Sequence, residues 1–87
     1  MTSNHRGKKI LLVDDHVLFR DGITLLLKSL VAGDSLYQAG TCEEALALVA
    51  RDPSIELVLM DINLPGTSGI NAISLIRAFV RNFRSFR

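Results

Sequence analysis

Two groups of carboxylates each follow an apolar stretch of the sequence. Asp14 and Asp15 come directly after Ile10-Leu11-Leu12-Val13, and Asp61 comes directly after Leu57-Val58-Leu59-Met60. If the two stretches are parallel strands of one sheet, their carboxyl ends meet at the edge where open α/β sheets bind ligands. Clustered carboxylates repel one another unless a cation neutralises them, and hard divalent cations prefer oxygen ligands. The three side chains therefore predict a divalent-metal site.

The segment after Asp61 predicts a sharp turn. Pro65 and Gly66 follow the strand closely, and Gly69 stands three residues further on. A G-x-x-G spacing is too common to indicate a phosphate-binding loop by itself. We expect these glycines to permit the tight turn and the close approach of the next helix start. The turn leaves Asp61 accessible at the end of its strand.

The segments that must position the carboxylates alternate between strand and helix. The stretch from Lys9 to Val13 is apolar on both faces, which is typical of a parallel strand covered by helices. Thr41 and Glu44 have the spacing of a helix capping box. The expected elements are, in order, a strand over 9–13, a helix over 16–30, a strand over 35–39, a helix over 41–51, a strand over 57–60 and a helix from 68 or 69. This alternation predicts a doubly wound parallel sheet.

The last part of the chain carries a helical pattern and a positive charge. Apolar residues recur at spacings of three and four from Ile70 to Phe83, and a second stripe is made of arginines. Residues 1–76 hold six Lys or Arg and all nine acids, a net charge of −3, whereas 77–87 hold four Arg and no acid, a net charge of +4. We therefore expect residues 78–87 to form a basic amphipathic helical tail.

Composition bounds the class of protein. The 87 residues are 48% hydrophobic and 22% charged, which suits one small globular domain. No apolar run approaches the roughly 20 residues that cross a bilayer, and the polar N-terminus has no signal-peptide pattern, so we expect no membrane association and a cytoplasmic location. The single cysteine, Cys42, is expected to be a small residue in a helix's first turn rather than a redox or metal-binding group.

Taken together, these features resemble the receiver domain of bacterial two-component response regulators. Asp14-Asp15-His16 followed by Leu18-Phe19-Arg20-Asp21-Gly22 resembles the NarL/FixJ (LuxR-type) subfamily in particular, and the similarity runs from about Lys8 to Arg77. The resemblance implies a flavodoxin-like (CheY-like) α/β fold, truncated to about three strands and three helices. The expected organisation is an N-terminal arm over 1–8, a partial receiver over 9–77 and the helical tail over 78–87.

The resemblance also implies a function. Asp61 is expected to accept a phosphoryl group from a sensor histidine kinase, with a Mg²⁺ that draws the two anions together. Asp15 is expected to ligate the ion directly, Asp14 through a bound water, and Asn63 through its backbone carbonyl. The chain is then a signalling module and not an enzyme, and the parent protein controls transcription through a DNA-binding output domain that this chain lacks.

The resemblance ends after the third strand-helix unit. The Ser/Thr and Lys residues with which the family's later strands bind the phosphoryl group have no counterparts here, so weak or absent phosphorylation is expected. The stretch from Leu57 to Met60 also becomes an exposed, apolar sheet edge, which is a template for pairing with another chain. The alternative function is therefore a self-associating receiver remnant, a dimer or larger homo-oligomer held through the third strand and third helix.

Other interpretations of the same residues stay open. Asp14 and Asp15 could cap the helix that follows, and Asp61 could be a turn residue. His16 could be a metal ligand or a proton donor, although a loop position at the helix start is favoured. A hydrolase built on Asp61 and Asn63 is disfavoured because an amide cannot give or take the proton.

The basic tail has a nucleic-acid interpretation. The four arginines of residues 77–87 are interleaved with Phe79, Phe83 and Phe86, so they could bind phosphates while the rings stack on bases. The simpler interpretation is that the arginines form the solvated face of a helix whose other face is buried.

Overall fold

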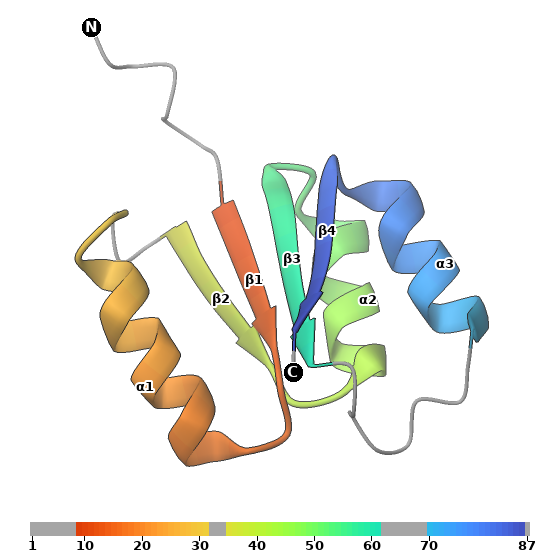
Figure 1. The fold of residues 1–87 in the computed structure, drawn as a ribbon. Coiled ribbons are helices and arrows are strands. Elements are labelled where there is room, and N and C mark those ends of the chain that lie inside the picture. The colour runs from red at the N-terminus through yellow and green to blue at the C-terminus, as the bar shows by residue number, and fades with distance from the viewer. Residues whose placement is uncertain (1–8, 32–34, 62–69, 87) are drawn as a thin grey trace, which may run out of the picture.

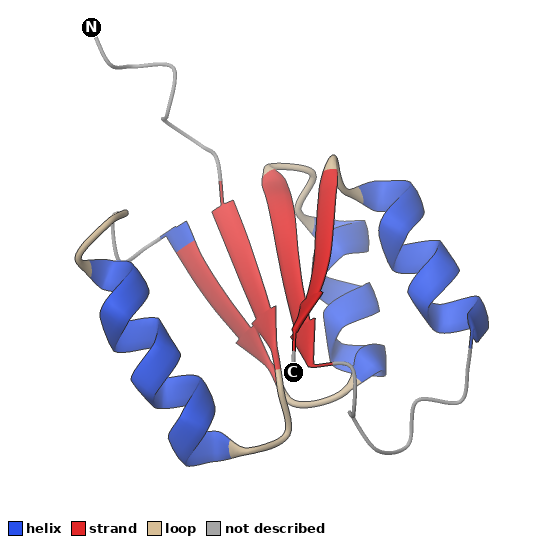
Figure 2. Ribbon diagram, in the orientation of Figure 1, coloured by secondary structure: helices blue, strands red, loops and turns tan. Residues whose placement is uncertain are grey.

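The described part of the chain forms a three-layer α/β fold. The computed structural model describes residues 9–31, 35–61 and 70–86, with side chains from residue 72 in the last segment. The elements are β1 (Lys9–Val13), α1 (Val17–Lys28), β2 (Leu36–Ala39), α2 (Cys42–Arg51), β3 (Ile55–Asp61), α3 (Ile70–Phe79) and β4 (Asn82–Phe86). All four strands are parallel and lie in the order β2-β1-β3-β4. Helix α1 lies on one side of this sheet, and α2 and α3 lie together on the other (Figures 1 and 2). None of the described helices could span a membrane.

The main core lies between the sheet and the pair α2 and α3. The alternating residues Leu11 and Val13 of β1 and Val58 and Met60 of β3 point into it, as period-two strands require. The cluster is completed from the helices and strand ends by Ala39, Cys42, Ala45, Val49, Ile55 and Ile76. Cys42 is therefore a small buried residue at the start of α2, as predicted.

The start of α2 confirms the predicted capping box. The Thr41 hydroxyl accepts a hydrogen bond from the backbone N–H of Glu44 (3.1 Å), and the Glu44 carboxylate accepts one from the N–H of Gly40 (2.7 Å). The carboxylate thus reaches one residue beyond the N-cap. Glu43 and Glu44 also lie in the first turn, where the partial positive charge of a helix start favours acids.

The prediction of a helical tail over 78–87 is wrong. Helix α3 ends at Phe79, and residues 82–86 pair as a parallel strand with β3, from Leu57 opposite Asn82 to Asp61 opposite Phe86. Phe83 packs on the main core, whereas Phe86 lies across the sheet against Phe19 of α1, with ring centroids 6.0 Å apart. The free edge of β3 offers backbone hydrogen bonds, and aromatic residues suit a pleated surface, so tertiary pairing overrides the helical spacing.

Strand β4 also corrects the expected sheet edge. Because β3 pairs with β1 on one side and with β4 on the other, it is not an exposed edge, and the sheet has four strands rather than three. The apolar side of α3 is likewise covered within the chain, since Ile76 is fully buried. Self-association through an exposed third strand therefore has no structural basis, and β4 is the edge strand on this side.

Three arginines near the end of the chain contact neighbouring residues of the fold. The guanidinium of Arg77 lies over the Phe83 ring, 4.7 Å from its centroid, and Arg81 lies 3.8 Å from the Glu56 carboxylate. Arg84 donates to the backbone carbonyl of Phe83 (3.1 Å). These contacts do not test the nucleic-acid interpretation, but they place the arginines on a strand and a helix end rather than along one helical stripe.

A polar cluster ties the amino end of the sheet to the turn between α2 and β3. The Lys9 ammonium donates to the Tyr37 hydroxyl and to Asp52 (3.0 Å each), and Tyr37 donates to the same Asp52 oxygen (2.5 Å). The other Asp52 oxygen accepts from the backbone N–H and the hydroxyl of Ser54 (2.9 and 2.5 Å). Hydrogen bonds from Ser54, Tyr37 and Lys9 hold the pKa of Asp52 well below its ordinary value, and those to Tyr37 and Asp52 raise the pKa of Lys9.

The substitution Asp52→Asn is expected to reduce stability at neutral pH and to flatten its dependence on acid. A lowered carboxyl pKa contributes stability that is present above the unfolded value, about 3.9, and is lost as the pH falls below it. The raised Lys9 pKa contributes stability that is complete below about pH 10.4 and is lost above it. Urea midpoints measured at pH 3, 7 and 9 check this, with the exposed Asp21→Asn as control. Parallel curves for wild type and Asp52→Asn between pH 3 and 7 would contradict it.

Candidate functional site

The carboxyl ends of β1 and β3 bring two buried aspartates together. Val13 is aligned with Met60 in the parallel register, so the next residues, Asp14 and Asp61, lie opposite each other. The Asp14 backbone N–H donates to the carbonyl of Ala39 (3.0 Å), which continues the pairing of β1 with β2 one residue past the strand. Both aspartate side chains are fully buried, so the prediction that Asp61 is accessible at the end of its strand is wrong. The strand ends thus deliver two carboxylates to one point beneath the surface.

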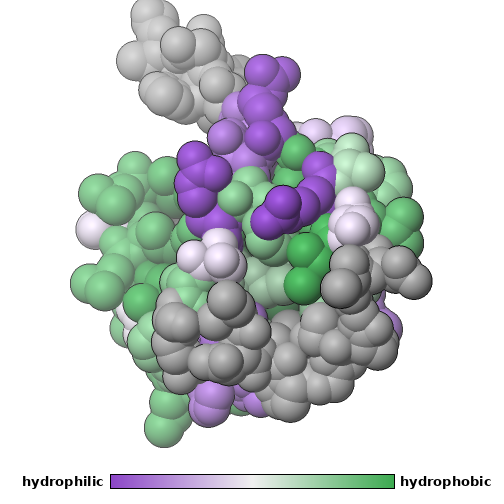
Figure 3. All heavy atoms as spheres, turned by 45° about the vertical axis from the view of Figure 1, so that its right-hand side comes forward, coloured by the Kyte–Doolittle hydropathy of each residue, from purple (hydrophilic) through white to green (hydrophobic). Residues whose placement is uncertain are grey.

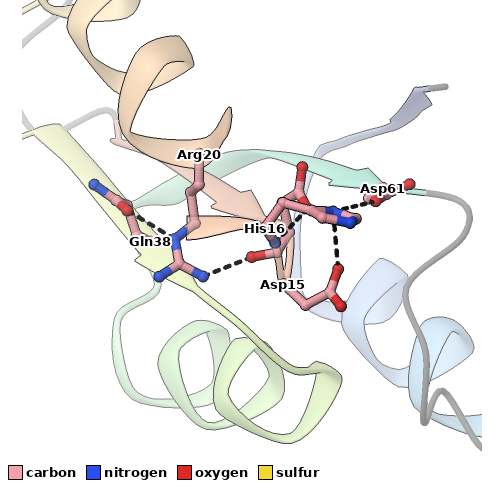
Figure 4. A network of polar contacts seen from close by, with 6 residues as sticks. Asp15, His16, Arg20, Gln38 and Asp61 are labelled. Atoms are coloured by element: carbon pink, nitrogen blue, oxygen red, sulfur yellow. Dashed lines mark hydrogen bonds and ion pairs between the residues drawn. The ribbon is translucent and has the colours of Figure 1, made fainter. Parts of the chain in front are cut away.

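Asp15 and His16 complete this group from the loop that leads into α1. The Nδ1 atom of His16 lies 3.0 Å from Asp14 Oδ1, 3.2 Å from Asp15 Oδ1 and 3.9 Å from Asp61 Oδ2 (Figure 4). One donor atom from each of the four residues falls within 4.8 Å of all the others. We call these four residues the acidic pocket. The sequence placed its three carboxylates correctly and left the position of the imidazole open.

The hydrogen bonds of Asp14 show whether it caps α1 or holds the loop before it. Helix α1 begins at Val17 with His16 as its N-cap, and the His16 side chain makes no capping hydrogen bond. The Oδ1 atom of Asp14 instead accepts from the backbone N–H of His16 (2.9 Å), which lies before the first helical turn. This contact holds the loop against the strand end. It fixes the β1–α1 connection over the pocket rather than capping the helix.

Arg20 is a residue of the site that the sequence did not single out for a role. Its side chain leaves the first turn of α1 and donates to the backbone carbonyl of Asp14 (2.5 Å) and to the Gln38 side chain (2.8 Å), as Figure 4 shows. A Cβ added to Gly40 would lie 3.0 Å from its guanidinium. Arg20 therefore joins α1, the exit of β1 and the end of β2. The feature of the sequence that could have indicated Arg20 is its position within the stretch 18–22, about one helical turn after the acidic pair.

Arg20→Ala is expected to weaken Mg²⁺ binding about tenfold, because residues that orient the ligands of a metal commonly matter by this amount. The variant loses the hydrogen bond that fixes the Asp14 carbonyl, which should lower the Mg²⁺ affinity. It also removes a positive charge close to the carboxylates, which should raise the Mg²⁺ affinity. Arg20→Lys keeps the charge without the planar fork and separates the two effects. Titration with Mg²⁺ followed by amide NMR shifts measures the affinity.

The matched control is Lys28→Ala, which removes one positive charge from the far end of the same helix. Lys28→Ala should bind Mg²⁺ as tightly as the wild type, and if Arg20→Ala and Arg20→Lys both did so as well, the positioning role of Arg20 would be refuted.

The donor set suits a hard divalent cation. Three carboxylates supply oxygen ligands, and Mg²⁺ needs few protein ligands because it retains several waters. Asn63, Pro65, Gly66 and Gly69 were predicted to supply a backbone ligand and the turn, and they lie outside the described residues. Like charges this close also cost stability in the absence of a counter-ion.

Comparison with known proteins decides the family. A sequence model of the family described as "Response regulator receiver domain" matches residues 10–84. The chain belongs to this family. The acidic pocket is accordingly of the kind that is typical of the Mg²⁺ site of receivers, and the chain is a receiver rather than a catalytic enzyme. The four-stranded 2-1-3-4 sheet agrees with the CheY-like fold that the sequence predicted.

Several regulators share this receiver sequence. The chain is 42% identical over 64 residues to the response regulator GacA of Pseudomonas aeruginosa, 36% identical over 63 residues to the response regulator UvrY of Escherichia coli, and 32% identical over 69 residues to a glycerol metabolism activator of Pseudomonas putida. These alignments cover 74%, 72% and 79% of this chain but only 29%, 28% and 31% of the relatives. The chain thus spans less than a third of the length of these relatives.

A solved structure is similar as well. The MaeR response regulator, determined with beryllium trifluoride bound, superposes with a TM-score of 0.75 at 27% identity. The superposition covers 91% of this chain and 66% of that one. The fold of this chain is therefore similar to that of a solved response regulator over most of its length.

Proposed function

We propose that this chain accepts a phosphoryl group on Asp61 from a sensor histidine kinase. The observation that supports this is the acidic pocket, which gathers Asp61 with Asp14, Asp15 and His16 at the carboxyl edge of the sheet. A metal held there supplies positive charge that offsets the repulsion between a carboxylate and an anionic phosphoryl donor. Asp14, Asp15 and Asp61 are the proposed side-chain ligands, and the Asn63 carbonyl is a proposed further one.

Each residue of the pocket has a distinct part in this proposal. Asp61 lies at the last position of β3, so the strand holds its carboxylate at the carboxyl edge of the sheet. Asp14 anchors the incoming loop through the His16 N–H, and Asp15, about one-third exposed, faces solvent where a hydrated cation enters.

The setting of the function is also proposed. The subfamily signature around His16 and Arg20, and relatives described as response regulators and an activator, support a NarL/FixJ-type regulator that acts in the cytoplasm and controls transcription. Contact with DNA would then belong to a separate output domain of the parent protein. The histidine kinase is the partner that the receiver family uses.

The decisive experiment is phosphoryl uptake from acetyl phosphate, followed by intact mass. The wild type is expected to gain one phosphoryl group in the presence of Mg²⁺ and none in the presence of a chelator. Asp61→Asn should gain none, while Asp21→Asn, which changes an exposed acid of α1, should behave as the wild type. Uptake by Asp61→Asn equal to that of the wild type would refute the acceptor assignment.

A second candidate is self-association, now through surfaces other than β3. Strand β4 is an edge strand, and α1 exposes several large apolar side chains, among them Leu18 (86% exposed), Leu25 (68%) and Leu26 (67%). Figure 3 shows hydrophobic surface on both sides of a hydrophilic area. Exposed apolar area and an unpaired strand edge both favour contact with another chain. Light scattering over a concentration series, with Leu25→Glu as the test variant, would show a concentration-dependent mass in the wild type alone.

A further inference from the structure

The geometry points to His16 as a nitrogen ligand of the acidic pocket, one that extends the range of bound cations from Mg²⁺ to the later divalent transition metals. This inference rests on the proposed function, because it concerns the same pocket. It adds a donor of a different chemical class to the carboxylates. The ions expected to bind the extended site include Ni²⁺, Cu²⁺ and Zn²⁺.

The backbone of His16 is fixed on both sides, which determines where its ring can go. The N–H of His16 donates to Asp14 Oδ1 (2.9 Å), and its carbonyl accepts from the N–H of Arg20 (2.9 Å) as the first hydrogen bond of α1. Its φ and ψ angles of −91° and 100° are extended, as an N-cap residue requires. With the main chain held in this way, the ring lies over the carboxylates (Figure 4).

The distances between donor atoms match those of a shared metal. In a six-coordinate shell with bonds of about 2.0–2.1 Å, neighbouring donors lie about 3.0 Å apart and opposite donors about 4.2 Å apart. The Nδ1 atom of His16 lies 3.0 and 3.2 Å from oxygens of Asp14 and Asp15 and 3.9 Å from an oxygen of Asp61. The His16 nitrogen therefore lies at ligand-like distances from all three oxygens, and the four donors, within 4.8 Å of one another, need only small side-chain shifts to share an ion. An ion pair of a protonated imidazole with the carboxylates would also give short contacts, so the two must be separated by experiment.

The chemistry of the donors sets the expected selectivity. Carboxylate and water oxygens suit Mg²⁺ and Mn²⁺, whereas imidazole favours Ni²⁺ and Zn²⁺. His16 is about half exposed, with 57% of its side chain accessible, so it can be a ligand for one ion and turn to solvent for another. Mg²⁺ affinity should consequently depend little on this residue, and the affinity for Ni²⁺ and Zn²⁺ should depend on it strongly.

The first test compares metal affinities in the wild type, His16→Asn and His5→Asn. Asparagine is a favoured N-cap, so His16→Asn keeps the start of α1 while an oxygen donor replaces the nitrogen. His5 is the other histidine of the sequence and controls for adventitious binding. We expect His16→Asn to weaken Ni²⁺ and Zn²⁺ binding by about tenfold or more and to change Mg²⁺ binding by less than about threefold. Equal losses for all three ions, or equal losses in both variants, would overturn the assignment.

The second test detects the nitrogen directly. Pulsed EPR of the wild type with bound Cu²⁺, which imidazole also favours, is expected to show coupling to an imidazole nitrogen, to change when the histidines carry ¹⁵N, and to lose the coupling in His16→Asn but not in His5→Asn. Cu²⁺ that binds without nitrogen coupling, or with a coupling that persists in His16→Asn, would overturn the role of His16 and leave the carboxylate site intact. A wild type that binds no Mg²⁺ would instead refute the proposed Mg²⁺ pocket, and the nitrogen coupling would still report whether His16 is a ligand.

Discussion

Asp61→Asn is expected to make the metal-free protein more stable by about 1–2 kcal/mol, although it removes the residue on which the proposed function depends. Asp14 and Asp61 are both fully buried, and their carboxylates lie within 4.8 Å of each other and of Asp15. Two like charges at this distance repel by roughly 1–4 kcal/mol, depending on the effective dielectric constant. The backbone N–H of His16, which donates to the Asp14 carboxylate, offsets part of this repulsion, so the net gain lies in the lower part of that range. The amide of asparagine has nearly the same shape, so packing changes little.

The same substitution should remove most of the stabilisation that Mg²⁺ gives. A ligand that binds only the folded state adds about 2.7 kcal/mol to the free energy of unfolding when it is present at 100 times its dissociation constant. The wild type should therefore gain stability steadily with Mg²⁺, whereas Asp61→Asn should start higher and respond weakly. Urea unfolding at fixed ionic strength, with and without Mg²⁺, measures both effects.

Asp21→Asn serves as the control, since it changes an exposed acid of α1 outside the pocket. It should leave both the baseline and the Mg²⁺ response as in the wild type. A destabilised Asp61→Asn protein with an unchanged Mg²⁺ response would mean that the carboxylate is bound within the fold and does not contribute to a cation site.

The sequence could predict those residues of the site whose positions are determined by the ends of two strands. A run of four apolar residues followed by a carboxylate predicts where a buried strand ends, and the parallel connection predicts that two such ends meet at one edge. Asp14, Asp15 and Asp61 follow from these rules alone. The observed register, with Val13 opposite Met60, is what those rules require.

The loop residues could not be predicted in the same way. Whether His16 turns toward the carboxylates depends on two backbone hydrogen bonds at the start of α1, and the reach of Arg20 depends on where that helix leans against β2. Neither contact has a sequence period or spacing that reports it. Both residues are separated from their partners by turns whose dihedral angles are decided by the packed fold.

The last part of the chain shows how a correct pattern can give a wrong structure. The spacing of Ile76, Val80 and Phe83 fits a helix, yet Phe83 lies in β4 and reaches the same core from the sheet. A chain that leaves a helix and reverses into a neighbouring strand can place an apolar side chain in the same core as the helix. The sequence spacing of the two side chains can then still be three or four residues. Local periodicity could not show that β3 has a free edge with which this segment pairs.

Ile76→Ala tests whether α3 is docked as this fold requires, and it is expected to reduce the free energy of unfolding by about 2–5 kcal/mol. Ile76 is fully buried among residues of α2 and of the sheet, so truncating it leaves a cavity in the main core. A domain of this size has a free energy of unfolding of only about 5–10 kcal/mol, so a substantial fraction of its stability is at risk. Urea denaturation with far-UV circular dichroism measures the loss.

Leu75→Ala provides a matched control on the same helix, because it removes an apolar side chain of the same size from a position that is 51% exposed. It should cost less than about 1 kcal/mol, since surface substitutions usually have small effects. The difference between two adjacent positions measures docking independently of helix propensity, which changes similarly in both variants. Equal losses at the two positions would mean that α3 does not present Ile76 to the core. In that case β4, which follows α3 after two residues, would lose the support that holds it beside β3 and its carboxylate.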